Sequence, residues 1–190
     1  MQRKLCIAAM IVSLSVFCAS AGAQMVVHAV SGMVKVVNTD SKTMIVTEDN
    51  GEISIFNLPT NAKVSLAFDK ALQSDSVNAS EFHHLGDYAV VYYYGYANDR
   101  TAVAVKDLGA GPFLKAEGAV VSFDKHTRTM TVKDDGGKSE TFALDDHLVV
   151  DSGISVASGR GYDPHKGYHV TVTYTQAGDK NTAVFIRSRQ

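Results

Sequence analysis

Histidine is the residue type in this sequence with the clearest capacity for site chemistry. Seven histidines are present, and neutral imidazole is a good ligand for Zn²⁺, Cu²⁺ and Ni²⁺. His165 and His169 bracket a turn and could meet across it. His83 and His84 are adjacent, and adjacent side chains diverge on a strand or a helix. The alternatives are a Zn or Cu site built from these four, scattered surface histidines, and a pH-sensing role.

Tyrosine is concentrated in one stretch, YAVVYYYGY, at residues 88–96. On a strand, alternation places four of these tyrosines on one face, and they are the candidate binding residues: Tyr88, Tyr92, Tyr94 and Tyr96. A tyrosine ring is apolar while its hydroxyl still finds water, which suits a contact surface. This face could pack against the rest of the chain near Phe113 and Leu114, meet another protein or a second copy, or stack a glycan ring.

Catalytic motifs are absent from the sequence. It contains no Gly-x-Ser-x-Gly, His-Glu-x-x-His or phosphate-binding loop. Asp145-Asp146-His147 places carboxylates beside a histidine, but it corresponds to Thr60-Asn61-Ala62 earlier in the chain, and both stretches are typical of a solvated turn. Gly159-Arg160-Gly161 is rich in glycine but lacks the strand-to-helix setting of a phosphate site. We therefore expect a protein that is not an enzyme.

The first residues have the order of a secretory signal peptide. A basic start is followed by an apolar stretch from Leu5 to Phe17 and then by small residues at Ala21 and Ala23. The apolar stretch is too short to cross a bilayer core of about 30 Å, so we expect no membrane span. Cleavage after Ala23 would make residues 1–23 the signal peptide and send the protein to the periplasm or the medium.

Cysteine and charge narrow the chemistry further. Both cysteines, Cys6 and Cys18, lie in the segment that cleavage removes, so we expect neither disulfides nor thiol chemistry in the mature chain. The whole chain carries a formal net charge of −2, and losing Arg3 and Lys4 makes it more acidic. Nucleic-acid binding depends on neutralising phosphates with basic side chains, so we expect no nucleic-acid partner.

The chain repeats itself once. Gly32 and Gly118 each open a copy, and Thr43-Met44 corresponds to Thr129-Met130. Further on, Gly86 corresponds to Gly167 and Tyr93 to Tyr174. Two long copies in order indicate tandem domains rather than a solenoid.

Each copy has the alternation and the turns of antiparallel strands. Val170, Val172 and Tyr174 alternate with threonines, and Asn50-Gly51 supplies a tight hairpin turn. The first copy predicts strands near 32–38, 42–48, 52–58, 62–67, 87–95 and 101–107. The second predicts them near 118–124, 128–134, 138–144, 147–151, 168–175 and 182–188. One short helix is expected at 81–85, between Ser80 and Gly86.

Comparison of the copies sorts the tyrosines. Tyr93 aligns with Tyr174, so both are expected in the core. Tyr88, Tyr92 and Tyr94 align with polar residues of the second copy, namely His169, Thr173 and Thr175. The outer face is therefore aromatic in one copy and polar in the other. Met44 and Met130 are expected to be core residues rather than copper ligands.

The repeated unit resembles the small OB-like barrels that occur, singly or in tandem, in exported bacterial proteins. The resemblance rests on Gly-x-Val, a Thr-Met-x-Val strand, an Asp/Asn-Gly turn, Phe-x-Leu and a closing Thr-Ala-Val strand. It implies an all-β fold of two tandem small antiparallel β-barrels with five to six strands each. The expected segments are a lead-in at 24–31, a first barrel at 32–107, a linker at 108–116 and a second barrel at 117–190.

These observations favour an exported, non-catalytic binding or interaction module of the cell envelope. Its contact surface would be the aromatic face of the first barrel, and its partner an envelope protein or a glycan. It would need no cofactor. The alternative function is a periplasmic Zn- or Cu-binding protein that uses surface histidines.

Overall fold

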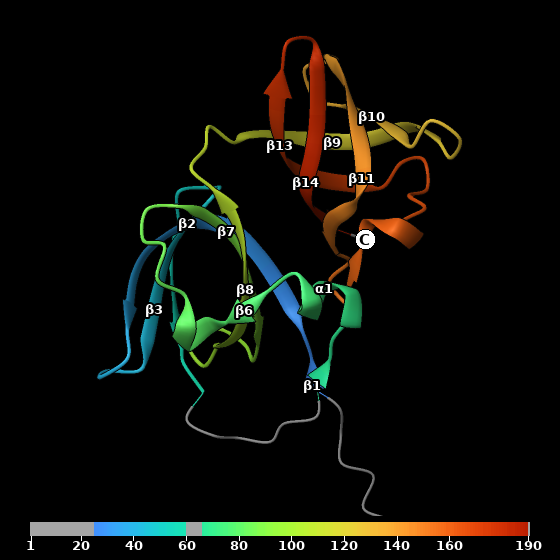
Figure 1. The fold of residues 1–190 in the computed structure, drawn as a ribbon. Helices are drawn as coiled ribbons and strands as arrows, with labels where there is room; N and C mark the ends of the chain where they lie inside the picture. Colours follow the sequence, from blue (N-terminus) through green and yellow to red (C-terminus); the bar gives the residue numbers. More distant parts are fainter. Residues whose placement is uncertain (1–24, 60–65, 190) are drawn as a thin grey trace, which may run out of the picture.

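The computed structural model describes residues 25–59 and 66–189 and shows an all-β protein built around two five-stranded rings (Figure 1). The predicted signal peptide at 1–23 lies outside the described residues. None of the helices in the described ranges is long and apolar enough to cross a bilayer.

The first ring contains five strands from the first copy of the repeat. They are β2 (His28–Asn38), β3 (Thr43–Glu48), β4 (Ile53–Asn57), β7 (Tyr88–Tyr94) and β8 (Thr101–Gly109). Neighbouring strands are paired in the order β4-β3-β2-β7-β8. A single parallel pairing, Asn57 with Thr101, joins β4 to β8 and closes the ring.

The second ring repeats this arrangement. Its strands are β9 (Leu114–Asp124), β10 (Thr129–Lys133), β11 (Ser139–Asp151), β13 (His169–Ala177) and β14 (Lys180–Arg189). The order is β10-β9-β13-β14-β11, and β10 also pairs with β11. The pairing of β11 with β14 is parallel and longer than its counterpart in the first ring. Both rings thus have the strand order of an OB-type barrel, which confirms the expected fold class.

Sequence alternation explains why these segments form strands. Burial alternates strictly along β3 and β4, so every second side chain reaches the interior. The hairpin turns contain glycines at positive φ, Gly51 at 85° and Gly137 at 90°, as tight turns require. The two interiors use equivalent residues, since Met44 and Phe56 in the first match Met130 and Phe142 in the second. The expectation that both methionines are core residues is confirmed.

Several strand bounds differ from those predicted. The strands β2 and β9 begin four residues before Gly32 and Gly118, so much of the predicted lead-in and linker is strand. They extend because β2 pairs with β7 as far as His28, and β9 pairs with β13 as far as Leu114. Of the strand predicted at 62–67, residues 62–65 lie outside the described part, and Leu66–Ala67 forms the short strand β5. It pairs with β1 (Met25–Val26).

The predicted helix at 81–85 is wrong. A 3₁₀ turn occupies Ala79–Glu81 instead, and the α-helix α1 lies earlier, at Lys70–Ser74. The Asp69 side chain caps α1 by accepting from the Ala71 amide at 2.8 Å. This helix has only five residues and a single buried side chain, Leu72, so it leaves little periodic signal. The remaining short elements are β6 (Val77–Asn78), β12 (Val156–Ser158) and a 3₁₀ turn at Gly159–Gly161.

Candidate functional site

The four candidate tyrosines do not share one environment. Tyr92 is fully buried, whereas Tyr96 is 79% exposed beyond the end of β7. Tyr88 is half-buried and lies against Phe113, with 4.8 Å between ring centroids. Tyr94 is half-buried, and Tyr93 packs on the first core beside Phe56. Alternation holds along β7, because Val91 and Tyr93 pack in the first core while Val90 and Tyr92 face the second repeat, so the surroundings of each position and not a change of face separate the candidate tyrosines.

Tyr92 belongs to an apolar cluster between the two rings. Its ring lies 4.7 Å from that of Phe68. The buried members from the first repeat are Val27, Ala29, Leu72, Val90, Tyr92 and Ala104, and those from the second are Val149, Val156 and Phe185. The second repeat therefore covers Tyr92, and the loop before β9 covers part of Tyr88. An external ligand does not reach Tyr92 in this arrangement.

Polar contacts surround this apolar cluster. The Asp49 carboxylate accepts hydrogen bonds from the hydroxyls of Ser31 and Thr173, which lie 3.0 Å from each other. The Asp151 carboxylate accepts from the Ala29 amide at 2.9 Å. Thr173 is 1% exposed, although the sequence places it on a polar outer face. The sequence signal for the burial of Thr173 is its alignment with Tyr92, because equivalent faces of the two barrels meet.

The four candidate metal-binding histidines are not brought together. His165 stacks edge-on against Tyr168 with 5.2 Å between centroids, and His169 is exposed on β13. His83 and His84 are both exposed. Of the four, His84 alone belongs to a group of three potential metal ligands, among the residues that the structure describes.

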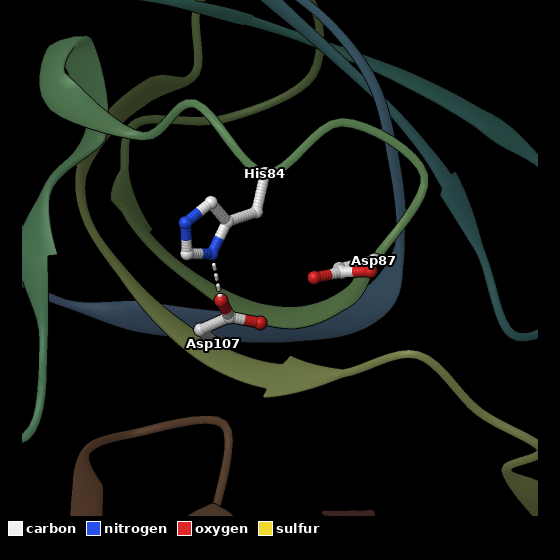
Figure 2. A group of neighbouring side chains, drawn as sticks. All are labelled: His84, Asp87 and Asp107. Carbon is white, nitrogen blue, oxygen red and sulfur yellow. Dashed lines mark hydrogen bonds and ion pairs between the residues drawn. The ribbon is translucent and has the colours of Figure 1, made fainter.

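That group, which we name the His–Asp cluster, consists of His84, Asp87 and Asp107 (Figure 2). One ligand atom from each residue lies within 4.8 Å of the others. His84 Nδ1 is 2.5 Å from Asp107 Oδ2. Asp87 lies on the same loop as His84, whereas Asp107 comes from β8, so the fold and not sequence proximity assembles the cluster. Sequence reasoning included His84 but missed both carboxylates.

The electrostatics of the His–Asp cluster favour a cation. The hydrogen bond to Asp107 and the charge of that carboxylate raise the pKa of His84, with a further contribution from Asp87. A hollow of about 450 Å³ adjoins the cluster and is lined in part by Phe82, His83, His84 and Asp107.

The first repeat also carries an exposed apolar surface, which we name the apolar strip: Val36, Ile45, Ile53 and Ile55. Ile53 is 70% and Ile55 54% exposed. Cross-strand pairing makes the strip continuous over β2, β3 and β4, because Val36 pairs with Ile45 and Ile45 with Ile55.

The second repeat is polar at the same positions. Ser122 pairs with Thr131, and Thr131 with Thr141, in the register of their counterparts Val36, Ile45 and Ile55. The hydroxyls of Thr131 and Thr141 are 2.9 Å apart, where the first repeat has two isoleucines. Ser139 stands in the place of Ile53. The same strand register therefore displays aliphatic side chains in one barrel and hydroxyls in the other.

The predicted turn at Asp145–His147 is instead part of β11, at a register shift in its pairing with β14. Its three side chains are exposed, and His147 Nδ1 lies 3.0 Å from Asp75 of the first repeat. No known protein family matches the sequence, and no curated protein is significantly similar to it.

Proposed function

We propose that this chain is a non-catalytic binding module of the bacterial cell envelope, and that the apolar strip is its contact surface. The observation that carries the proposal is the exposure of Ile53 and Ile55, where the second repeat has Ser139 and Thr141. A soluble barrel rarely exposes neighbouring large aliphatic side chains unless another molecule covers them. The signal-like start of the sequence supports the envelope as its location.

The contact surface thus differs from the one first expected. The aromatic face packs against other parts of the same chain, since the second repeat covers Tyr92 and the loop before β9 lies on Tyr88. That contact holds the two barrels together and leaves the strip of the first barrel open. A protein partner fits this surface better than a glycan, because aliphatic side chains offer no flat ring for a sugar to stack on.

The edge of β4 favours a partner that presents an extended segment. The Asn57 amide points away from β3 and donates to the Arg100 carbonyl at 2.8 Å. Along a strand, residues of the same parity direct their amides to the same edge, so those of Ile53 and Ile55 also point away from β3. Within the described residues, β4 pairs with β8 at Asn57 alone. An added strand would use this edge and cover the isoleucines.

A labelled peptide with the sequence of residues 52–58, EISIFNL, tests whether an extended apolar segment, like that of a second copy, adds to the edge of β4. We expect the parent protein to raise its fluorescence anisotropy. The double substitution Ile53→Ser plus Ile55→Thr copies the second repeat and keeps strand-compatible residues. We expect it to weaken peptide binding about tenfold or more, which corresponds to about 1.4 kcal/mol.

The matched control is Ile154→Ser, which removes another isoleucine that is 71% exposed but lies outside the strip. It should bind the peptide as the parent does. Thermal melting of each variant establishes that the barrels remain folded. Absence of peptide binding by the parent, or equal binding by the double variant, would overturn the proposed contact surface. Sedimentation velocity of the parent then tells whether a second copy occupies the strip.

A further inference from the structure

We propose that the His–Asp cluster is a binding site for a divalent transition-metal ion, with His84, Asp87 and Asp107 as its protein ligands. This inference is independent of the apolar strip. Figure 2 shows the three side chains directed toward one another, and His84 and Asp107 are exposed. His84 and Asp87 come from the loop before β7, and Asp107 comes from β8.

The distances are close to those that a metal ion requires. In a tetrahedral zinc site, ligand atoms about 2.0–2.2 Å from the ion lie about 3.3–3.5 Å from one another. The three ligand atoms of the cluster already fall within 4.8 Å of each other. His84 Nδ1 and Asp107 Oδ2, now 2.5 Å apart, would move apart by about 0.8 Å as the ion takes the place of the hydrogen bond between them. His84 and Asp107 are exposed and Asp87 is half-buried, so small side-chain rotations would supply both movements.

Backbone contacts hold the ligands in place. Asp107 Oδ1 accepts from the Gly109 amide at 2.8 Å, which leaves Oδ2 directed toward His84. The Gly86 amide donates to the Val34 carbonyl at 2.8 Å, and the Val34 amide donates to the Asp87 carbonyl at 3.1 Å. The loop that carries His84 and Asp87 is therefore fixed to β2. In metal sites, hydrogen bonds to the ligand residues orient their ligand atoms toward the ion.

The ligand types select among metals. One imidazole nitrogen with two carboxylate oxygens suits Zn²⁺ or Cu²⁺, whereas Ca²⁺ takes six to eight oxygens. Two carboxylates also balance the charge of a divalent ion. Three protein ligands leave at least one coordination position for water or for a group supplied by another molecule.

The second repeat contains a natural comparison. His165 occupies the place of His84, but Tyr168 stands in place of Asp87 and Ser188 in place of Asp107. The histidine is thus present in both repeats, while the two carboxylates occur in the first alone. A histidine in that position does not by itself make a three-ligand metal site, so we expect metal binding in the first repeat and not at His165.

Titration calorimetry of the tag-free chain with ZnCl₂ at neutral pH tests the site. We expect one Zn²⁺ to bind per chain. His84→Gln and Asp107→Asn should each weaken binding about tenfold or more, since each removes one of three ligands. His165→Gln is the matched control and should bind as the parent does. In ¹H–¹⁵N spectra, Zn²⁺ should shift the amides of Gly86 and Gly109 and leave that of Gly167 unchanged.

A parent protein that takes up no stoichiometric Zn²⁺ or Cu²⁺ would overturn the site. Equal weakening by His165→Gln and His84→Gln would do the same, because binding would then depend on scattered histidines. Thermal melts in the presence of a chelator show whether the variants are folded, so that loss of binding is not confused with loss of structure.

Discussion

Tyr92 and Thr173 occupy equivalent positions in the two repeats, and both are buried where the repeats meet. Tyr92 is 0% exposed among apolar side chains from both barrels, and Thr173 is 1% exposed among Ser31 and Asp49. Ala104 and Phe185, on the next strand of each ring, are a second equivalent pair in the same contact. The barrels therefore meet through corresponding faces. The first repeat has the larger side chain at the Tyr92–Thr173 pair, and the second repeat has the larger one at the Ala104–Phe185 pair.

Substituting Tyr92 by Ala should destabilise the chain by about 3–5 kcal/mol, because it leaves a large cavity in the contact between the barrels. Denaturation with urea, monitored by circular dichroism, measures the change in the free energy of unfolding. Tyr96→Ala is the matched control, since Tyr96 is 79% exposed. Its effect should stay within about 0.5 kcal/mol. Similar losses for the two substitutions would contradict a buried structural role for Tyr92.

The fold could be predicted from the sequence because its determinants are local and occur twice. The alternation in β3 and β10 and the glycine turns repeat at matching positions, so each copy supports the interpretation of the other. The contact between the copies was harder to predict. The threonine alternation of β13 predicts a solvated face, whereas Thr173 is 1% exposed. Its burial depends on Asp49, which lies far away in the sequence and supplies the acceptor that a buried hydroxyl needs.

The hydroxyls of Ser31 and Thr173 should be energetically coupled through Asp49. Both donate to the same carboxylate oxygen and lie 3.0 Å apart. Ser31→Ala and Thr173→Val should each cost about 1–3 kcal/mol, because the carboxylate loses a donor in a partly buried setting. In the double variant the loss should be smaller than the sum of the single losses. A double-mutant cycle measures this difference, for which we expect about 0.5–3 kcal/mol.

Thr171→Val serves as the control for that cycle, because Thr171 lies on the same strand but outside the Asp49 network. Its effect should add to that of Ser31→Ala. Simple additivity for Ser31 with Thr173 would show that the two hydroxyls act independently of the shared carboxylate.

Alkaline pH should weaken the fold through its buried tyrosines. Burial raises the pKa of Tyr162 to about 12 and also raises that of Tyr92. A raised pKa in the folded state gives stability that is complete below the unfolded value near 10 and is lost as pH rises further. From Tyr162 alone we expect a loss of about 1 kcal/mol between pH 9 and pH 11. Urea denaturation at each pH measures it. Tyr162→Phe should reduce the loss, whereas Tyr96→Phe should not.

The two barrels should unfold as one unit. Among the residues that the structure describes, nine buried apolar ones lie between the barrels, and the Asp151 carboxylate of the second barrel accepts from the Ala29 amide of the first. Met44→Ala and Met130→Ala empty equivalent core positions and should each cost about 2–5 kcal/mol. In scanning calorimetry, both variants should show a single transition at lower temperature. Two separate transitions in either variant would mean that the contact between the barrels does not couple their unfolding.

The candidate metal site shows a different limit of sequence reasoning. His84 could be singled out because histidine is a good metal ligand, but nothing in the spacing connects it to Asp107. That proximity depends on the pairing of β7 with β8 and on the loop that the Gly86 amide attaches to β2. The sequence therefore indicates a residue type, and the strand pairing determines its partners.

The glycines that open the two repeats should be intolerant of even one added methyl group. A Cβ at Gly32 would lie 2.3 Å from the Thr47 carbonyl oxygen, and one at Gly118 would lie 2.2 Å from the Lys133 carbonyl oxygen. Neither glycine has a positive φ, so the constraint is the close approach of a neighbouring strand and not backbone conformation.

Gly32→Ala and Gly118→Ala should each cost about 1–3 kcal/mol or more. Urea denaturation measures both losses. Gly136→Ala is the control, because its Cβ would find its nearest atom at 3.4 Å, and it should have little effect. Full stability of Gly32→Ala would show that the first barrel can separate β2 from β3 at no cost, which would contradict the tight closure of the ring.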